Sequence, residues 1–136
     1  MMSNVFTKRA LAGMITAILL TSSASFVEAQ AGVQRKILLQ QDLDIPGHET
    51  LLVDVTLAVG AREGRHTHAG TLVIHVLEGE LTLEQEGLPA RTFKAGESGI
   101  VKPGQVHEGI NHGKIPVKVL ATFIAEKGKP LTTQVR

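Results

Sequence analysis

Three histidines carry the chemistry that the sequence offers most plainly. His66 and His68 are separated by one residue, and side chains at positions i and i+2 of a β-strand point to the same face. Two imidazoles placed in this way can bind one metal ion. His107 lies in a second stretch rich in Gly and Pro, and it can supply a third nitrogen if the fold joins the two stretches. Because the chain contains no cysteine, a metal must be held by imidazole, carboxylate or water.

The segments that must position these histidines show the two-residue period of β-strands. Apolar and polar side chains alternate along residues 50–59 and 80–85, and residues 71–77 form a nearly continuous aliphatic run. Many short strands separated by Gly or Pro predict an all-β sandwich or barrel. Residues 127–136 are expected to form a tail or an edge-strand extension. Further short strands are expected at 35–39, 90–94, 98–101, 106–110 and 117–126.

Residues 1–29 are interpreted as a secretory signal peptide. Lys8 and Arg9 precede an eleven-residue apolar run, and cleavage is expected after Ala29, with Ala31 as the alternative. A permanent membrane helix is the competing interpretation, but the run is shorter than the ~20 residues needed to span a bilayer. We therefore expect a periplasmic or secreted protein with no stable membrane insertion once the signal is removed.

The remaining residues, 30–136, have the size of one domain and no net charge. Without Lys8, Arg9 and Glu28, 12 basic and 12 acidic residues remain, counted from 14 and 13 in the whole chain. A neutral domain has no basic excess to neutralise a phosphate backbone. The chain has four Phe and neither Trp nor Tyr, too few for a base-stacking platform. We therefore expect no nucleic-acid partner.

The two histidine-bearing stretches, 60–79 and 96–111, resemble the paired signature motifs of the cupin family, which are small β-barrels of the jelly-roll type. The resemblance implies a single cupin β-barrel domain over residues 30–136. It also implies that His66, His68 and His107 bind a divalent metal ion, and that two copies pair as a homodimer. The residues that match the family motifs are Gly60, His66, His68 and Gly79 in the first stretch and Gly96, Gly104, His107 and Asn111 in the second.

The sequence departs from the family motif at two positions. Lys102 replaces a proline, and Pro103 follows it, which is expected to preserve the turn. Leu72 occupies the position of the family's metal-binding Glu, and its parity along a strand without a bulge points it towards the metal and its ligand. Three neutral imidazoles leave both positive charges of a divalent ion uncancelled, which favours anionic or enolate ligands. Fe(II) is the favoured ion, with Mn(II), Zn(II) or Ni(II) as alternatives.

The resemblance implies two possible functions. Three-His sites occur in the family's thiol dioxygenases and β-diketone-cleaving dioxygenases, so we expect an exported metal-dependent oxidoreductase of dioxygenase type. Its substrate is expected to be a small organic acid or an enolisable compound. The absence of Tyr argues against a direct copy of the thiol dioxygenases, in which a tyrosine assists. The alternative is a non-catalytic cupin that captures a metal or small ligand in the periplasm.

Several polar residues near the motifs are candidates for supporting roles. Arg62 and Arg65 are candidates for binding a substrate carboxylate, with a solvated turn as the alternative. Glu63 and Glu108 are the acidic candidates for proton transfer. Asn111 is expected to brace the loop that follows His107. The other histidines are given structural roles, with His48 in a turn, His75 packed or at an interface, and His112 in an exposed loop, although His112 could also act as a base beside the site.

Overall fold

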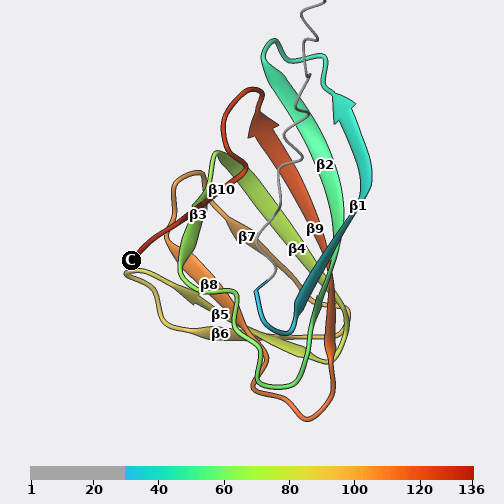
Figure 1. The fold of residues 1–136 in the computed structure, drawn as a ribbon, viewed down its shortest axis with the longest axis vertical. Helices are drawn as coiled ribbons and strands as arrows, with labels where there is room; N and C mark the ends of the chain where they lie inside the picture. The colour runs from blue at the N-terminus through green and yellow to red at the C-terminus, as the bar shows by residue number, and fades with distance from the viewer. Residues whose placement is uncertain (1–29) are drawn as a thin grey trace, which may run out of the picture.

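Antiparallel strands form all the regular structure of residues 30–136, the part of the chain that the computed structural model describes (Figure 1). The ten strands make two five-stranded sheets. In spatial order the first sheet contains β1 (Val33–Asp42), β2 (His48–Leu57), β9 (Val117–Glu126), β4 (Gly70–Glu78) and β7 (Ser98–Val101). The second contains β10 (Thr132–Gln134), β3 (His66–His68), β8 (His107–Ile110), β5 (Glu80–Gln85) and β6 (Arg91–Lys94). The signal-peptide prediction for residues 1–29 lies outside the described residues.

The alternating pattern of the sequence becomes the core between the two sheets. Along β2 every second residue is buried, and β9 alternates in the same way. The all-β prediction is therefore confirmed. The strands form two layers because a sheet with one apolar face must cover that face with a second layer. β2 begins at His48 and ends at Leu57, whereas the alternation had suggested residues 50–59. The strand ends early because the chain turns at residues 58–60, where Gly60 has a φ of 77°.

The chain changes sheets directly after the first histidine pair. β3 belongs to the second sheet and β4 to the first, with only Ala69 between them. Gly70 makes this crossing possible, because a Cβ there would overlap the backbone carbonyl of Ile124 on β9. His68 and Leu72 therefore stand on opposite sheets, and both face the interior. The condition of one strand without a bulge is not met, yet Leu72 lines the cavity beside the histidines, as its parity had indicated.

The C-terminal residues form an edge strand of the second sheet. β10 pairs with β3, so that Thr132 lies opposite His68 and Gln134 lies opposite His66. On its other side β3 pairs with β8 through His66 and His107. Of the two predictions for residues 127–136, the edge-strand extension is correct. Because of this pairing, the histidine-bearing strand β3 lies between β10 and β8 in the second sheet.

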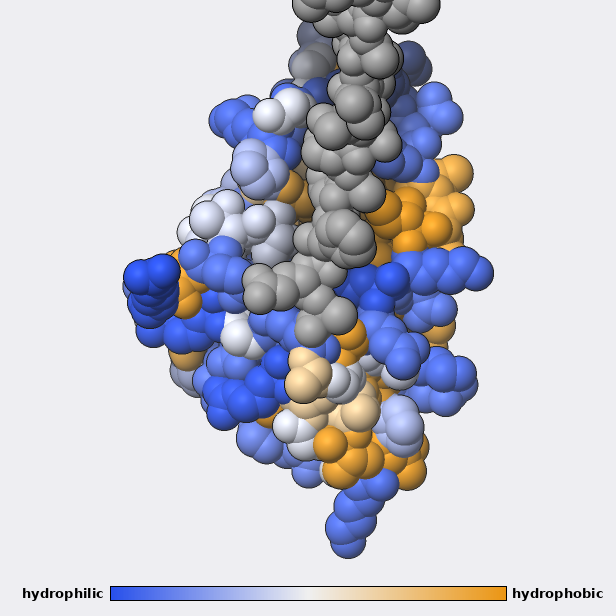
Figure 2. All heavy atoms as spheres, viewed as in Figure 1, coloured by the Kyte–Doolittle hydropathy of each residue, from blue (hydrophilic) through white to orange (hydrophobic). Residues whose placement is uncertain are grey.

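The first sheet has much longer strands than the second, and β1 lies at its edge (Figure 1). Nine of the ten residues of β1 are exposed. They include Ile37, Leu38 and Leu39, which are 56%, 46% and 50% exposed, and hydrophobic atoms gather on that side of the molecule in Figure 2.

The described residues contain no helix that is long and apolar enough to cross a membrane.

Candidate metal centre

The fold brings His66, His68 and His107 together in one buried cluster. Their exposed fractions are 3%, 6% and 2%, and their ring centroids lie 4.3 to 4.9 Å apart. One ring nitrogen from each residue lies within 4.8 Å of the others. The pairing of β3 with β8 sets this geometry, because it places His66 directly opposite His107. His66 and His107 are 41 positions apart in the sequence, yet they meet across one strand pair.

Backbone carbonyls fix the orientation of all three rings. The Nδ1 atoms of His66, His68 and His107 lie 2.7, 2.9 and 2.9 Å from carbonyl oxygens, which can only accept. Each Nδ1 therefore carries the proton, and each Nε2 has a free lone pair. A backbone carbonyl that holds Nδ1–H is the usual support of a metal-binding imidazole. The acceptors are the carbonyls of Gly64, Leu131 and Gln105 respectively.

The electrostatic state of the imidazoles also suits a cation. Burial lowers the pKa of His68 to about 3 and lowers the pKa of His107 as well. Both rings are therefore neutral at neutral pH, which is the form that binds metal. The Nε2 atom of His107 is buried and has no hydrogen-bond partner. An orphaned buried acceptor beside two other imidazoles fits a divalent metal ion bound by three nitrogens.

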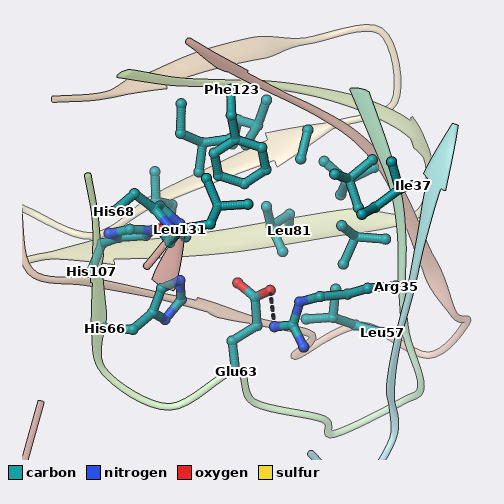
Figure 3. A pocket seen from close by; sticks show the side chains of 17 residues that line it. Arg35, Ile37, Leu57, Glu63, His66, His68, Leu81, His107, Phe123 and Leu131 are labelled. Carbon is teal, nitrogen blue, oxygen red and sulfur yellow. Dashed lines mark hydrogen bonds and ion pairs between the residues drawn. The ribbon is translucent and has the colours of Figure 1, made fainter. Parts of the chain in front are cut away.

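A cavity of about 440 Å³ opens beside the three histidines (Figure 3). Its walls are mainly aliphatic and come from both sheets. Leu72 and Phe123 lie on these walls, and the Phe123 ring meets His68 edge to face at 4.8 Å. Phe93, the other aromatic candidate for the pocket, is buried elsewhere under the guanidinium of Arg91. The remaining apolar lining residues are Ile37, Val53, Val55, Leu57, Ile74, Leu81, Leu83, Val119, Ala121 and Leu131.

Arg62 and Arg65, expected at the substrate, do not line this cavity. The Arg62 guanidinium donates two hydrogen bonds to Glu108, at 2.9 and 2.8 Å, and Arg65 pairs with Glu86. Both side chains are drawn outwards by these acidic partners on the outer side of the second sheet. The hydrogen bond from Arg62 also holds the pKa of Glu108 below its usual range. Glu108 is thus a buried ion-pair partner outside the cavity.

Two charged side chains do reach the cavity, namely Arg35 on β1 and Glu63 in the loop before β3 (Figure 3). They form an ion pair with an Nη2–Oε1 distance of 2.8 Å. Glu63 was among the proton-transfer candidates, whereas Arg35 was missed. The available signal was strand parity, because Arg35 is two residues from Val33, a buried residue on the same face of β1.

The other polar candidates have structural roles. Asn111 is fully buried, and its side-chain nitrogen lies 2.9 to 3.1 Å from three backbone carbonyls. Its expected role as a loop brace is confirmed. His75 lies 2.8 Å from the Ser98 hydroxyl, outside the cavity. His112 is exposed, and His48 contacts the carbonyl of Pro46 in the turn before β2.

Comparisons with solved structures find the same fold in several proteins. A conserved protein with a double-stranded β-helix domain from Klebsiella pneumoniae is 23% identical, with a TM-score of 0.64, 79% of this chain covered and 88% of the other. An oxalate oxidase is 22% identical, with a TM-score of 0.61 and coverages of 79% and 57%. The DMSP lyase DddQ from Ruegeria pomeroyi is 19% identical, with a TM-score of 0.59 and 63% of this chain covered. This chain spans only 43% of that lyase.

At these identities the solved structures establish the fold alone. No curated protein matches the chain. A family model described as "Cupin domain" matches residues 53–123, a range that includes all three clustered histidines and more than half of the chain. The chain belongs to the cupin family.

Proposed function

We propose that this protein is a metal-dependent cupin in which His66, His68 and His107 hold a divalent ion at one end of an apolar cavity. The observation that carries the proposal is the convergence of three imidazoles oriented by backbone carbonyls, with the Nε2 of His107 buried and unpartnered. Three protein ligands leave coordination positions open for water or a ligand. A bound ion would act there as a Lewis acid, and as a redox centre if it is iron or manganese.

The cavity supports a small and largely apolar molecule as the ligand. Most of its lining is aliphatic, and its volume of about 440 Å³ lies within the range of small-molecule sites. Imidazole binds a metal ion in its uncharged form, so an ion held by three histidines keeps both positive charges and attracts an anionic oxygen such as an enolate or a carboxylate. The proposed activity is therefore that of a dioxygenase-type oxidoreductase with Fe(II) as the favoured ion and Mn(II), Zn(II) or Ni(II) as alternatives. An oxalate oxidase is among the proteins with the same fold, which agrees with redox chemistry on a small acid.

A non-catalytic function as a metal or ligand carrier is the second candidate. It is favoured by Leu72, which gives the cavity an aliphatic wall where the family motif has a carboxylate. Among the described residues that line the cavity, Glu63 is the single carboxylate, and it is already paired with Arg35. Such a site offers few groups for moving protons.

One series of measurements tests the proposal and separates the two candidates. Metal content of the protein purified without added metal is measured for the native chain, for His66→Ala, and for His75→Ala as the control outside the cluster. We expect close to one ion per native chain and per control, and almost none in His66→Ala. Oxygen consumption with diketones, thiols and phenols then follows, and a metal-loaded protein that consumes no oxygen with any of them favours the carrier.

Export and self-association are further parts of the proposal. The signal-like residues 1–29 support a periplasmic or secreted location. The outer edge of β1 is unpaired within the sheet and carries exposed Ile37, Leu38 and Leu39, which supports pairing of two copies. Light scattering on the mature protein tests the homodimer, and a monomer at all concentrations would contradict it.

A further inference from the structure

The Arg35–Glu63 pair stands apart from every other ion pair of the described residues, because both of its members line the cavity that the three histidines line. The remaining pairs lie elsewhere, for example Lys118–Glu78 on the first sheet. In Figure 3 the Glu63 carboxylate lies between His66 and Arg35 and points into the cavity. The side chains of Arg35 and Glu63 are only 29% and 15% exposed, so water screens their charges less than it screens those of a surface pair.

The backbone around Glu63 is shaped to hold its carboxylate in this place. Gly109 lies two residues after His107 on β8, and a Cβ there would lie 2.5 Å from Oε2 of Glu63. The Glu63 amide donates to the Gly109 carbonyl at 3.0 Å, and Gln30 donates to the Glu63 carbonyl. The lack of a side chain at position 109 therefore leaves the space that the carboxylate occupies. The Glu63 carboxylate is therefore seated against the backbone of β8.

The two charges of the pair act in opposite directions on a cation held between the rings. Both side chains line the cavity that the three histidines line, and the Glu63 carboxylate lies between His66 and Arg35 in Figure 3. Glu63 attracts a cation at the three histidines, and Arg35 repels it.

We propose that the Arg35–Glu63 pair sets the affinity of the three-His centre for its metal ion. Leu72 stands where the family motif has a carboxylate, and Glu63 supplies a negative charge from another part of the cavity wall. Arg35 holds Glu63 in place, and its positive charge reduces the attraction of Glu63 for the metal ion. Neither residue belongs to the group of side chains close enough to share one ion, which consists of the three histidines. The inference rests on the proposed function, since it concerns the same metal centre.

The test is the dissociation constant of Zn(II), measured by competition with a chromophoric chelator at fixed pH and ionic strength. Glu63→Gln leaves Arg35 uncompensated and should weaken binding about tenfold, as other changes to groups around metal ligands do. Arg35→Met leaves Glu63 uncompensated and should tighten binding. The double variant restores a cavity without this charge pair and should return to within about threefold of the native value, because the two opposite effects cancel.

Matched controls break an ion pair outside the cavity. Glu78→Gln and Lys118→Met remove the partners of an exposed pair with a 3.2 Å separation and should leave the Zn(II) affinity unchanged. A misfolded variant cannot bind more tightly, so the gain in Arg35→Met separates charge from structural damage. If Arg35→Met and Glu63→Gln both weaken binding, or neither changes it, while the native protein binds Zn(II), this inference is overturned and the three-His centre stands. If the native protein binds no Zn(II), the proposed function itself fails.

Discussion

The two sheets contribute different things to the same cavity. The short-stranded second sheet supplies all three histidines, through β3 and β8, and its edge strand β10 follows directly after Leu131, whose carbonyl holds His68. The long-stranded first sheet supplies Leu72 and Phe123 and most of the aliphatic lining. The three histidines therefore belong to one sheet, and most of the aliphatic wall belongs to the other. The chain passes from one sheet to the other at Ala69, between β3 and β4. This separation predicts that changes in the wall mainly affect stability, whereas changes in the second sheet mainly affect metal binding.

Leu57→Ala tests the wall and should have the largest effect on stability. Leu57 on β2 is 1% exposed, and truncating a buried leucine to alanine costs about 2–5 kcal/mol of unfolding free energy. The variant that remains folded should still bind metal, because no ligand or ligand support is removed. Chemical denaturation and metal content, measured on the same sample, check both parts. Loss of metal from a fully folded variant would show that the two sheets are not independent.

Leu72→Glu places a carboxylate on the wall opposite the imidazoles. Leu72 is 5% exposed, so a charged side chain there should destabilise the metal-free protein by a few kcal/mol, on the order of other buried ionisable substitutions. Burial raises a carboxyl pKa, so this loss should grow as the pH rises above the ordinary Glu value of about 4.3. A divalent ion should reverse the loss and bind more tightly than in the native chain. Thermal melts with and without metal at pH 5 and pH 8 measure this effect, and Leu72→Gln is the uncharged control.

Removal of residues 131–136 tests the support of His68. The truncation deletes β10 and the Leu131 carbonyl that accepts from Nδ1 of His68 at 2.9 Å. Loss of such a support lowers metal affinity about 10- to 100-fold. Thr133→Ala keeps the backbone and is the control, because its side chain is exposed and only the strand pairing is needed. Unchanged metal affinity in the truncated chain would show that β10 has no part in the site.

The metal-free protein should lose stability in acid. Burial holds the pKa of His68 at about 3 in the folded state, against about 6.5 in the unfolded chain. The unfolded state therefore binds protons first, and stability should fall as the pH drops below about 6.5 and continue to fall towards 3. Above that range His68 contributes no slope. Melting temperatures between pH 7 and pH 4 should show a shallower decline in His68→Gln than in the native chain.

Local patterns predicted the strands, because alternation is a short-range rule, whereas the resemblance to the cupin motifs predicted the histidine cluster. The two-residue period marked β2 and β5, and the paired motifs implied that His66 and His107 share one site. The Leu131 carbonyl that orients the His68 ring could not be predicted in this way, because its position depends on the pairing of distant segments. Leu131 reaches His68 only because β10 pairs with β3.

The charged residues of the cavity show the same limit. Arg62 and Arg65 are closest to the histidine pair in sequence, but Glu108 and Glu86 draw them away from the cavity. Arg35 is thirty-one positions before His66, yet the register of β1 against β2 places it opposite Val55, on the inner face. A side chain's partner, rather than its position in a motif, decided which charges face the site.

The most direct test of the account is metal content in His107→Ala beside Leu57→Ala, each measured on folded protein isolated without added metal. A three-His centre predicts close to one ion per native chain, close to one in folded Leu57→Ala, and almost none in His107→Ala with its fold retained. Stoichiometric metal in His107→Ala, or none in the native chain, would contradict the three-His centre.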